Sequence, residues 1–259
     1  MVLKLIKHEF KYLGRYLLLI WAGMILMIVS QRLLTELRES QNTIWQLVSG
    51  TAFGLLFFTL AAMFLVTFGA IVMRFYQNMF SGEGYLTFTL PVKASQIVFS
   101  KLFTGAVFML VPLLIAGLVL VSYIRAPETW YLLYSGFIEF MAESDLPIYV
   151  LVIWGLSIVL APVLQLLEFY TAMSLGQLAN RNKIIFSIIA YIGIYVAKQF
   201  LGVIIWLSLL MGNYVEKIEM YPFQVVKYAS IIGFVTTISL IVINWLIVNY
   251  LCKNKLNLE

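Results

Sequence analysis

The chain consists of six long apolar runs that are separated by shorter polar segments. The runs cover residues 16–31, 50–73, 102–124, 148–175, 184–211 and 229–251. A helix needs about 20 apolar residues to cross the hydrocarbon core of a bilayer. Each run therefore predicts one membrane-spanning helix. The first run is the shortest, and it reaches both interfaces if Arg15 and Arg32 extend outward from its ends.

Two of the polar segments predict further helices at the membrane surface. In residues 1–15, apolar positions 2, 3, 5, 6, 10 and 13 are interleaved with Lys4, Lys7 and Lys11. This pattern predicts a basic amphipathic helix along the inner interface, and the alternative is a plain helical extension of the first span. Residues 126–147 combine five aromatic side chains with several acids, which predicts a short helix at the outer interface.

The basic residues favour one orientation of the six spans. With the amino terminus inside, eleven Lys and Arg residues fall in inner segments and five in outer segments, while Lys198 lies within a span. Inner loops of membrane proteins carry the excess of Lys and Arg. Both termini are therefore predicted to be cytoplasmic.

Composition supports a membrane protein and narrows the range of functions. Of 259 residues, 63% are hydrophobic and 11% are charged, against about 45–50% and about 25% in ordinary soluble domains. A water-soluble fold could not bury that much apolar surface. The basic residues behind the formal charge of +5 stand at the ends of spans rather than in one patch, which argues against a nucleic-acid partner. The predicted fold class is an all-α polytopic membrane protein, with residues 1–259 in a single transmembrane domain.

Several residue types that intramembrane enzymes need are missing. The only histidine is His8 and the only aspartate is Asp145, and both lie outside the predicted spans. The predicted spans therefore cannot form the site of a serine–histidine protease, of a two-aspartate protease or of a haem held by two histidines. The sequence also contains neither an HExxH zinc motif nor a GxxxxGKS or GxxxxGKT phosphate loop. We therefore expect this chain to have no enzymatic activity, no metal and no cofactor of its own.

The inner segment between the second and third spans, residues 74–101, has the most distinctive sequence. Gly82 and Gly84 interrupt the second helix after Ser81, and Pro91 suits the first turn of the next helix because its ring fixes φ. Residues 83–90 can form a short helix or an extended piece at the membrane face, and they are rich in Tyr, Phe and Thr. Surplus aromatic residues in a loop mark either a protein contact or an anchor at the lipid interface, and both interpretations stay open.

The stretch Gly82-Glu83-Gly84-Tyr85-Leu86-Thr87-Phe88-Thr89-Leu90-Pro91-Val92, followed by Gln96 and Lys101, resembles the cytoplasmic loop of ABC-2-type transporter permeases. In that family a short coupling helix at this place docks on a separate ATP-hydrolysing subunit. The resemblance implies that the coupling contacts are made by Ser81, Gly82, Glu83, Gly84, Tyr85, Leu86, Thr87 and Phe88. Residues 1–15 resemble the connecting helix of the family, and six spans with both termini inside match its half-transporter layout.

The resemblance also implies what this chain assembles with and carries. ATP and Mg²⁺ would bind to a partner ATPase subunit. A second permease copy, identical or a close paralogue, would complete the pathway in a bacterial plasma membrane. Small bacterial permeases of this kind include exporters of amphipathic peptide toxins, such as phenol-soluble modulins, and lantibiotic immunity transporters. The resemblance therefore implies ATP-driven export of amphipathic or peptide-like cargo.

Two ionisable residues lie inside predicted spans, Glu168 in the fourth and Lys198 in the fifth. Each alone would cost about 2.5–3.5 kcal/mol on insertion scales. Because a short hairpin joins the two helices, an ion pair between them is expected, and it would act as a packing clamp. The alternative is that Lys198 faces the transport pathway together with Gln199, Tyr195 and Tyr191, and meets acidic or amphipathic cargo there.

Two other functions fit the same composition. A secondary transporter driven by an ion gradient would use Glu168 as its proton site, although paired interrupted helices in two halves are not evident. A non-transporting assembly or sensory subunit is the other alternative. Co-purification with an ATPase separates the exporter from both.

Overall fold

The computed structural model describes residues 2–36, 43–81, 84, 91–122, 124, 127–144, 146–179, 181–209 and 222–254. The regular elements of this part are all helices: α1 (Val2–Glu36), α2 (Thr43–Phe80), α4 (Ala94–Ser122), α5 (Pro127–Ser144), α6 (Ile148–Gly176), α7 (Lys183–Leu209) and α9 (Pro222–Asn254). All of these except α5 are long and apolar enough to cross a membrane. The predicted all-α membrane fold with six spans is confirmed.

Three of the helices, α1, α2 and α9, continue beyond both ends of the apolar runs that predicted them. α2 has 38 residues and is about 57 Å long at about 1.5 Å per residue, whereas the hydrocarbon core is about 30 Å thick. In lipid the backbone N–H and C=O groups find no water, so a helix satisfies them internally along the whole span. Nothing forces the helix to stop where the apolar run ends, and α2 extends beyond the hydrocarbon core.

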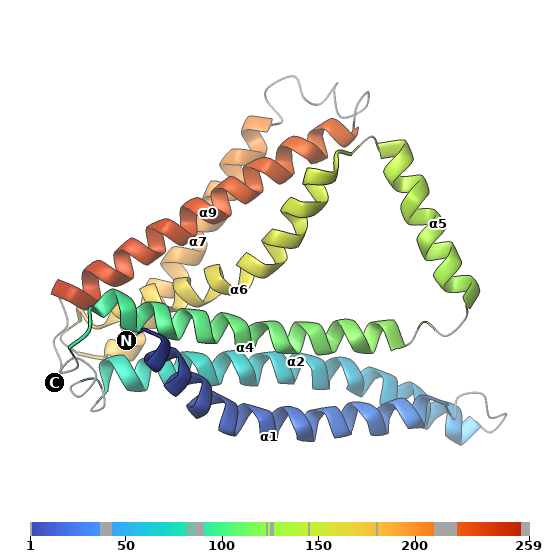
Figure 1. Ribbon diagram of the computed structural model, residues 1–259, viewed down its shortest axis with the longest axis horizontal. Coiled ribbons are helices and arrows are strands. Elements are labelled where there is room, and N and C mark those ends of the chain that lie inside the picture. The colour runs from blue at the N-terminus through green and yellow to red at the C-terminus, as the bar shows by residue number, and fades with distance from the viewer. Residues whose placement is uncertain are drawn as a thin grey trace.

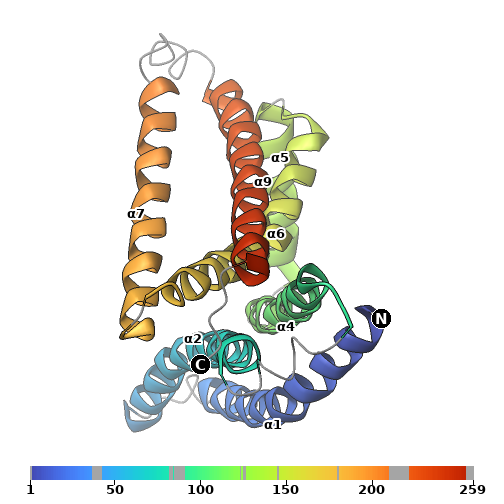
Figure 2. The same ribbon diagram turned by 90° about the vertical axis from the view of Figure 1, so that its left-hand side faces the viewer.

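α1 joins the predicted surface helix and the first span without a break at residue 15. Figure 2 shows its first turns running across the direction of its remaining length. Lys4, Lys7 and Lys11 are exposed, while Leu5 and Phe10 pack against the core of the chain. The apolar face of this first segment therefore contacts the other helices of the chain.

The helices form two arms that meet at one end of the molecule (Figure 1). α1, α2 and α4 lie together in one arm, and α6 packs against α7 and α9 in the other. The first turns of α1 and the last turns of α9 lie where the arms meet, and the arms diverge from there. α5 links the far end of α4 to the start of α6 across the open side. The start of α1 and the end of α9 therefore lie at the same end of the molecule. That this end faces the cytoplasm stays a prediction.

The two arms pack closely where they meet. The rings of Phe75 on α2 and Tyr170 on α6 stack with their centroids 3.6 Å apart, and both side chains are fully buried. Gly105 on α4 leaves room beside them. A Cβ at Gly105 would lie 2.8 Å from Cγ2 of Ile71 and 3.0 Å from Cδ1 of Leu166. α4 can therefore approach α2 and α6 this closely only with glycine at this position.

Replacing Gly105 with valine should destabilise the protein by about 1–3 kcal/mol, the usual cost of overpacking a dense core. Gly117→Val is the matched control, because it lies on the same helix and a Cβ there meets no atom within 4 Å. Thermal unfolding of the purified variants in detergent micelles measures the difference. Equal melting temperatures for the two variants would contradict the role given to Gly105.

Candidate functional site

The segment that connects α2 to α4 is described only at its two ends. The Ser81 hydroxyl donates to the carbonyl of Gln77, and the Gly84 N–H donates to the Ser81 carbonyl at 2.7 Å. These bonds turn the chain at the end of α2, where Gly84 is buried. The other expected coupling residues, Gly82, Glu83, Tyr85, Leu86, Thr87 and Phe88, lie outside the described residues.

The start of α4 differs from the prediction. α4 begins at Ala94, so Pro91 does not stand in its first turn, and that prediction is wrong. Gln96 marks the start instead. Its Oε1 accepts a hydrogen bond from the Lys93 N–H at 3.4 Å, and its own N–H donates to the Lys93 carbonyl at 2.9 Å. A Gln at the third helical position that reaches back to the capping residue satisfies a backbone donor that the helix leaves free.

A buried group of charges joins three helices close to this segment. The Glu9 carboxylate on α1 lies 2.6 Å from Lys101 Nζ on α4 and 3.5 Å from Arg74 Nε on α2. Glu9 is 9% exposed and Lys101 is 4% exposed. Arg74 and Lys101 each stand about 10 Å along their helices from the ends that bound the connecting segment, at about 1.5 Å per residue. We call Glu9, Arg74 and Lys101 the inner charge cluster.

Arg74 has a second contact with α1 within the same region. Its guanidinium carbon lies 3.6 Å from the centroid of the Tyr12 ring. A cation over an aromatic face is attracted by the negative face of the ring, and the attraction is strongest where water is excluded. The first turns of α1 are thus tied to α2 through two side chains, Glu9 and Tyr12, and to α4 through Glu9.

From the sequence, Arg74 and Lys101 count toward topology, and Lys101 also belongs to the motif that carries the resemblance, whereas Glu9 is not singled out. A signal was present. Glu9 opens a series at four-residue spacing that continues with Leu13, Leu17 and Trp21, and these three are 5%, 0% and 4% exposed. Residues at this spacing share one face of a helix. A carboxylate on a buried face needs a cationic partner. The spacing of the series therefore predicts a cation beside Glu9.

The second charged site lies inside the spans. Lys198 Nζ on α7 contacts both carboxylate oxygens of Glu168 on α6, each at 2.8 Å. Glu168 is 1% exposed in its side chain, whereas Lys198 is 29% exposed. The expected contact between the two helices is therefore present. Its geometry suits a packing clamp, because each charge has its counter-charge at hydrogen-bonding distance.

The side chains expected to surround Lys198 divide into two groups. Tyr191 accepts a hydrogen bond from Gln165 Nε2 at 3.0 Å, so it joins α7 to α6. The Tyr195 ring centroid lies 5.9 Å from Lys198 Nζ, and both Tyr195 and Gln199 are exposed. α7 therefore presents a tyrosine, a lysine and a glutamine side by side on a helix that is mainly apolar. The clamp and the pathway interpretation both remain open with this arrangement.

Within the described ranges, no three His, Cys, Asp or Glu side chains gather where they could hold a metal ion. Comparison of the chain with family models, with curated proteins and with solved structures finds no match. The fold defines the class of the protein, an all-helical multi-pass membrane protein.

Replacing Glu9 with glutamine should lower the free energy of unfolding by about 3–5 kcal/mol, because it removes the buried carboxylate that Lys101 and Arg74 both contact. The double variant Glu9→Gln/Lys101→Met should lose less than the sum of its two single variants, since the partners are removed together. Glu128→Gln, at an exposed carboxylate on α5, is the control and should leave stability unchanged. Chemical unfolding in detergent measures all four variants. Additive losses in the double variant would show that Glu9 and Lys101 are not coupled.

Proposed function

We propose that this chain is the membrane permease subunit of an ATP-binding cassette exporter, which moves amphipathic or peptide-like cargo out of a bacterial cell. A separate ATPase subunit binds ATP and Mg²⁺ and docks on the segment between α2 and α4. A second permease copy, identical or a close paralogue, completes the pathway. This chain contributes no catalytic residue to the ATP hydrolysis.

The observation that carries the proposal is the inner charge cluster. A force applied to the connecting segment acts on α2 and α4 at once, because the segment joins their ends. Glu9 links both helices to the first turns of α1 through Lys101 and Arg74. The three helices of one arm are therefore fastened together near the point at which an external motor would act. If the inner charge cluster served only to hold α1, α2 and α4 together, it would not need to lie beside the connecting segment.

The division into two arms would allow such a force to move one arm relative to the other. The arms share their closest contact at one end, through Phe75 and Tyr170, and diverge toward the other end (Figure 1). Closure of a pair of ATPase subunits would shift the docked segments and rotate one arm against the other. Rigid-body rotation about a packed interface is a common way for small displacements to be converted into opening of a pathway.

An amphipathic cargo suits the exposed side of α7. Tyr195, Lys198 and Gln199 stand on neighbouring positions of a helix whose other exposed side chains are mainly apolar. A surface of this kind offers a partly exposed cation and hydrogen-bonding groups among apolar side chains. It can meet both faces of an amphipathic peptide, with Lys198 meeting acidic groups.

The Glu168–Lys198 pair disfavours a secondary transporter that uses Glu168 as its proton site. Both carboxylate oxygens already accept hydrogen bonds from Lys198. A packing clamp between α6 and α7 accounts for both charges without assigning a transported proton to either of them. The exporter is therefore the function that the geometry supports best.

Replacing Tyr85 in the connecting segment with glutamate should abolish co-purification with the ATP-binding subunit, or should leave a complex whose ATP hydrolysis no longer responds to cargo. The reason is that a charge at an aromatic docking contact is desolvated without a partner. The measurement is affinity purification of the tagged chain from its own membrane, with the retained subunits identified by mass spectrometry and their ATPase rate recorded.

Tyr131→Glu is the matched control, because Tyr131 lies on α5 at the opposite end of the bundle (Figure 1) and is 71% exposed. It should retain the ATPase subunit and the cargo response. A wild-type chain that retains no ATP-binding cassette subunit would contradict the proposed function. Unchanged coupling in Tyr85→Glu would contradict the assignment of the docking segment.

A further inference from the structure

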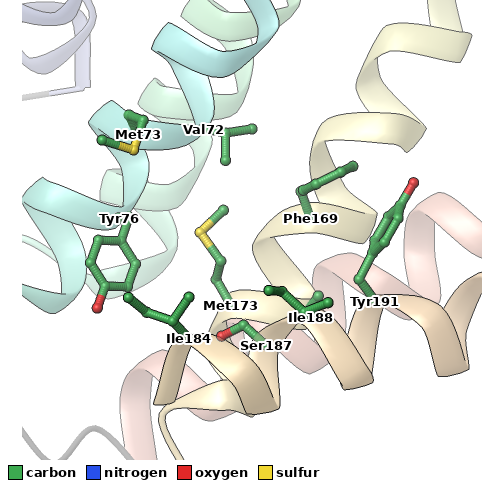
Figure 3. Close-up of a pocket in the computed structure, with 10 residues that line it drawn as sticks. Val72, Met73, Tyr76, Phe169, Met173, Ile184, Ser187, Ile188 and Tyr191 are labelled. Atoms are coloured by element: carbon green, nitrogen blue, oxygen red, sulfur yellow. The ribbon is translucent and has the colours of Figure 1, made fainter. Parts of the chain in front are cut away.

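A cavity of about 340 Å³ lies between the two arms, bounded by α2 on one side and by α6 and α7 on the other. Its volume falls in the range of about 300–1,000 Å³ that is typical of small-molecule sites. None of the described side chains that line it is charged. Figure 3 shows Met173 reaching into the space from α6, with Tyr76 and Tyr191 at opposite ends. The cavity is therefore an apolar slot with a hydroxyl group near each end.

The cavity opens at the surface of the spans. Its floor is buried, with Ala172 2% exposed and Met173 7% exposed, whereas the rim residues Met73, Ile184 and Ile188 are 57%, 62% and 54% exposed. The most apolar window of α7 has none of its residues buried within the chain. A slot that opens sideways from such a helix faces the acyl chains of the bilayer. Of the groups that the bilayer offers, an unbranched acyl chain of a lipid fits an uncharged slot of this kind.

Cations lie beside one end of the slot. α7 begins at Lys183, directly before the rim residue Ile184, and Arg181 two positions earlier is exposed. From Ile184 to Tyr191 the slot follows α7 for about 10 Å at about 1.5 Å per residue, which is within the thickness of one leaflet. A lipid whose acyl chain enters the slot from this leaflet places its phosphate near Arg181 and Lys183. Basic residues at the ends of membrane helices are the usual partners of anionic head groups.

We propose that this slot binds one acyl chain of an anionic phospholipid from the leaflet next to Arg181 and Lys183, which is the cytoplasmic leaflet in the predicted orientation. The bound chain contacts both arms, since Met73 belongs to α2 while Met173 and Ile188 belong to α6 and α7. It therefore fills the space between the arms on this side. Methionine side chains at the rim and on the floor adapt to a flexible ligand. The inference depends neither on an ATPase partner nor on the cargo.

The test is native mass spectrometry of the full chain, purified in mild detergent and supplied with phosphatidylglycerol or with phosphatidylcholine that carries the same oleoyl chains. The wild-type protein should retain one lipid per chain. It should prefer phosphatidylglycerol by about fivefold for each cation that meets the head group, which corresponds to about 1 kcal/mol per basic residue near a membrane surface. Wild-type protein that retains no lipid, or retains the two lipids equally, overturns the proposal.

Two pairs of variants separate the acyl-chain contact from the head-group contact. Ile188→Trp fills the mouth of the slot and should abolish retention of both lipids. Ile158→Trp, at a 62% exposed position on α6 outside the slot, should retain them. Arg181→Gln/Lys183→Gln should equalise the two lipids, while Lys4→Gln/Lys7→Gln, which removes two exposed charges from α1, should keep the preference.

Both variants of the first pair change an exposed rim or surface position, so both are expected to fold, and elution as a single species in size-exclusion chromatography checks this. Equal lipid retention by Ile188→Trp and Ile158→Trp would place the lipid elsewhere and overturn the proposal. A second copy of the chain in the slot would give a wild-type dimer without lipid that Ile188→Trp converts to a monomer. That result would overturn the proposal as well.

Discussion

Glu9 is a carboxylate buried on the face of α1 that packs against α2 and α4, and its charge is tolerated there because Lys101 and Arg74 meet it. Removing a charge from water costs several kcal/mol, and only close counter-charges offset that cost. The need for Glu9 to contact both Lys101 and Arg74 fixes the positions of α1, α2 and α4 relative to one another at one end of the bundle. Elsewhere in this arm most contacts are apolar, and three hydrogen bonds join the helices, from Trp21 to Thr67, from Gln31 to Thr59 and from Arg32 to the Ser122 carbonyl. Apolar packing alone is less selective for direction and register.

The rest of the structure depends on this end being rigid. Phe75 lies one position beyond Arg74 on α2 and stacks on Tyr170 of α6, so the fixed arm is also the surface on which the second arm packs. Gly105 lets α4 approach the same place. In the proposed function, this contact between the arms and their divergence from it (Figure 1) would let a displacement at the connecting segment move the far ends of the helices.

Features that depend on one helix, or on two helices joined by a short hairpin, were predictable from the sequence. The spans follow from the length of their apolar runs, and the Glu168–Lys198 contact follows from two charges on helices joined by a short hairpin. Features that depend on packing between distant segments were not predictable in the same way. The divergence of the arms has no signature in any single stretch of the sequence. Glu9 was missed because its place on the same helix face as Leu13, Leu17 and Trp21 was not considered.

The error at the start of α4 has a local physical cause. Pro91 was assigned to the first turn of a helix because its φ suits that position, but the Lys93–Gln96 cap places the start at Ala94. The spans were predicted from hydropathy alone, and α1, α2 and α9 continue beyond them as helix because their own hydrogen bonds sustain them. Most of the coupling residues lie outside the described ranges, so their docking role stays a prediction from the sequence.

The central claim is that an outside ATPase drives transport by acting on the connecting segment of this bundle. The most direct measurement is uptake of a fluorescent amphipathic peptide into inside-out membrane vesicles from cells that produce the chain, with Mg²⁺–ATP and the proton gradient varied separately. The account predicts uptake that requires Mg²⁺–ATP and persists when an uncoupler collapses the gradient. Uptake that continues without ATP and disappears with the gradient would contradict it.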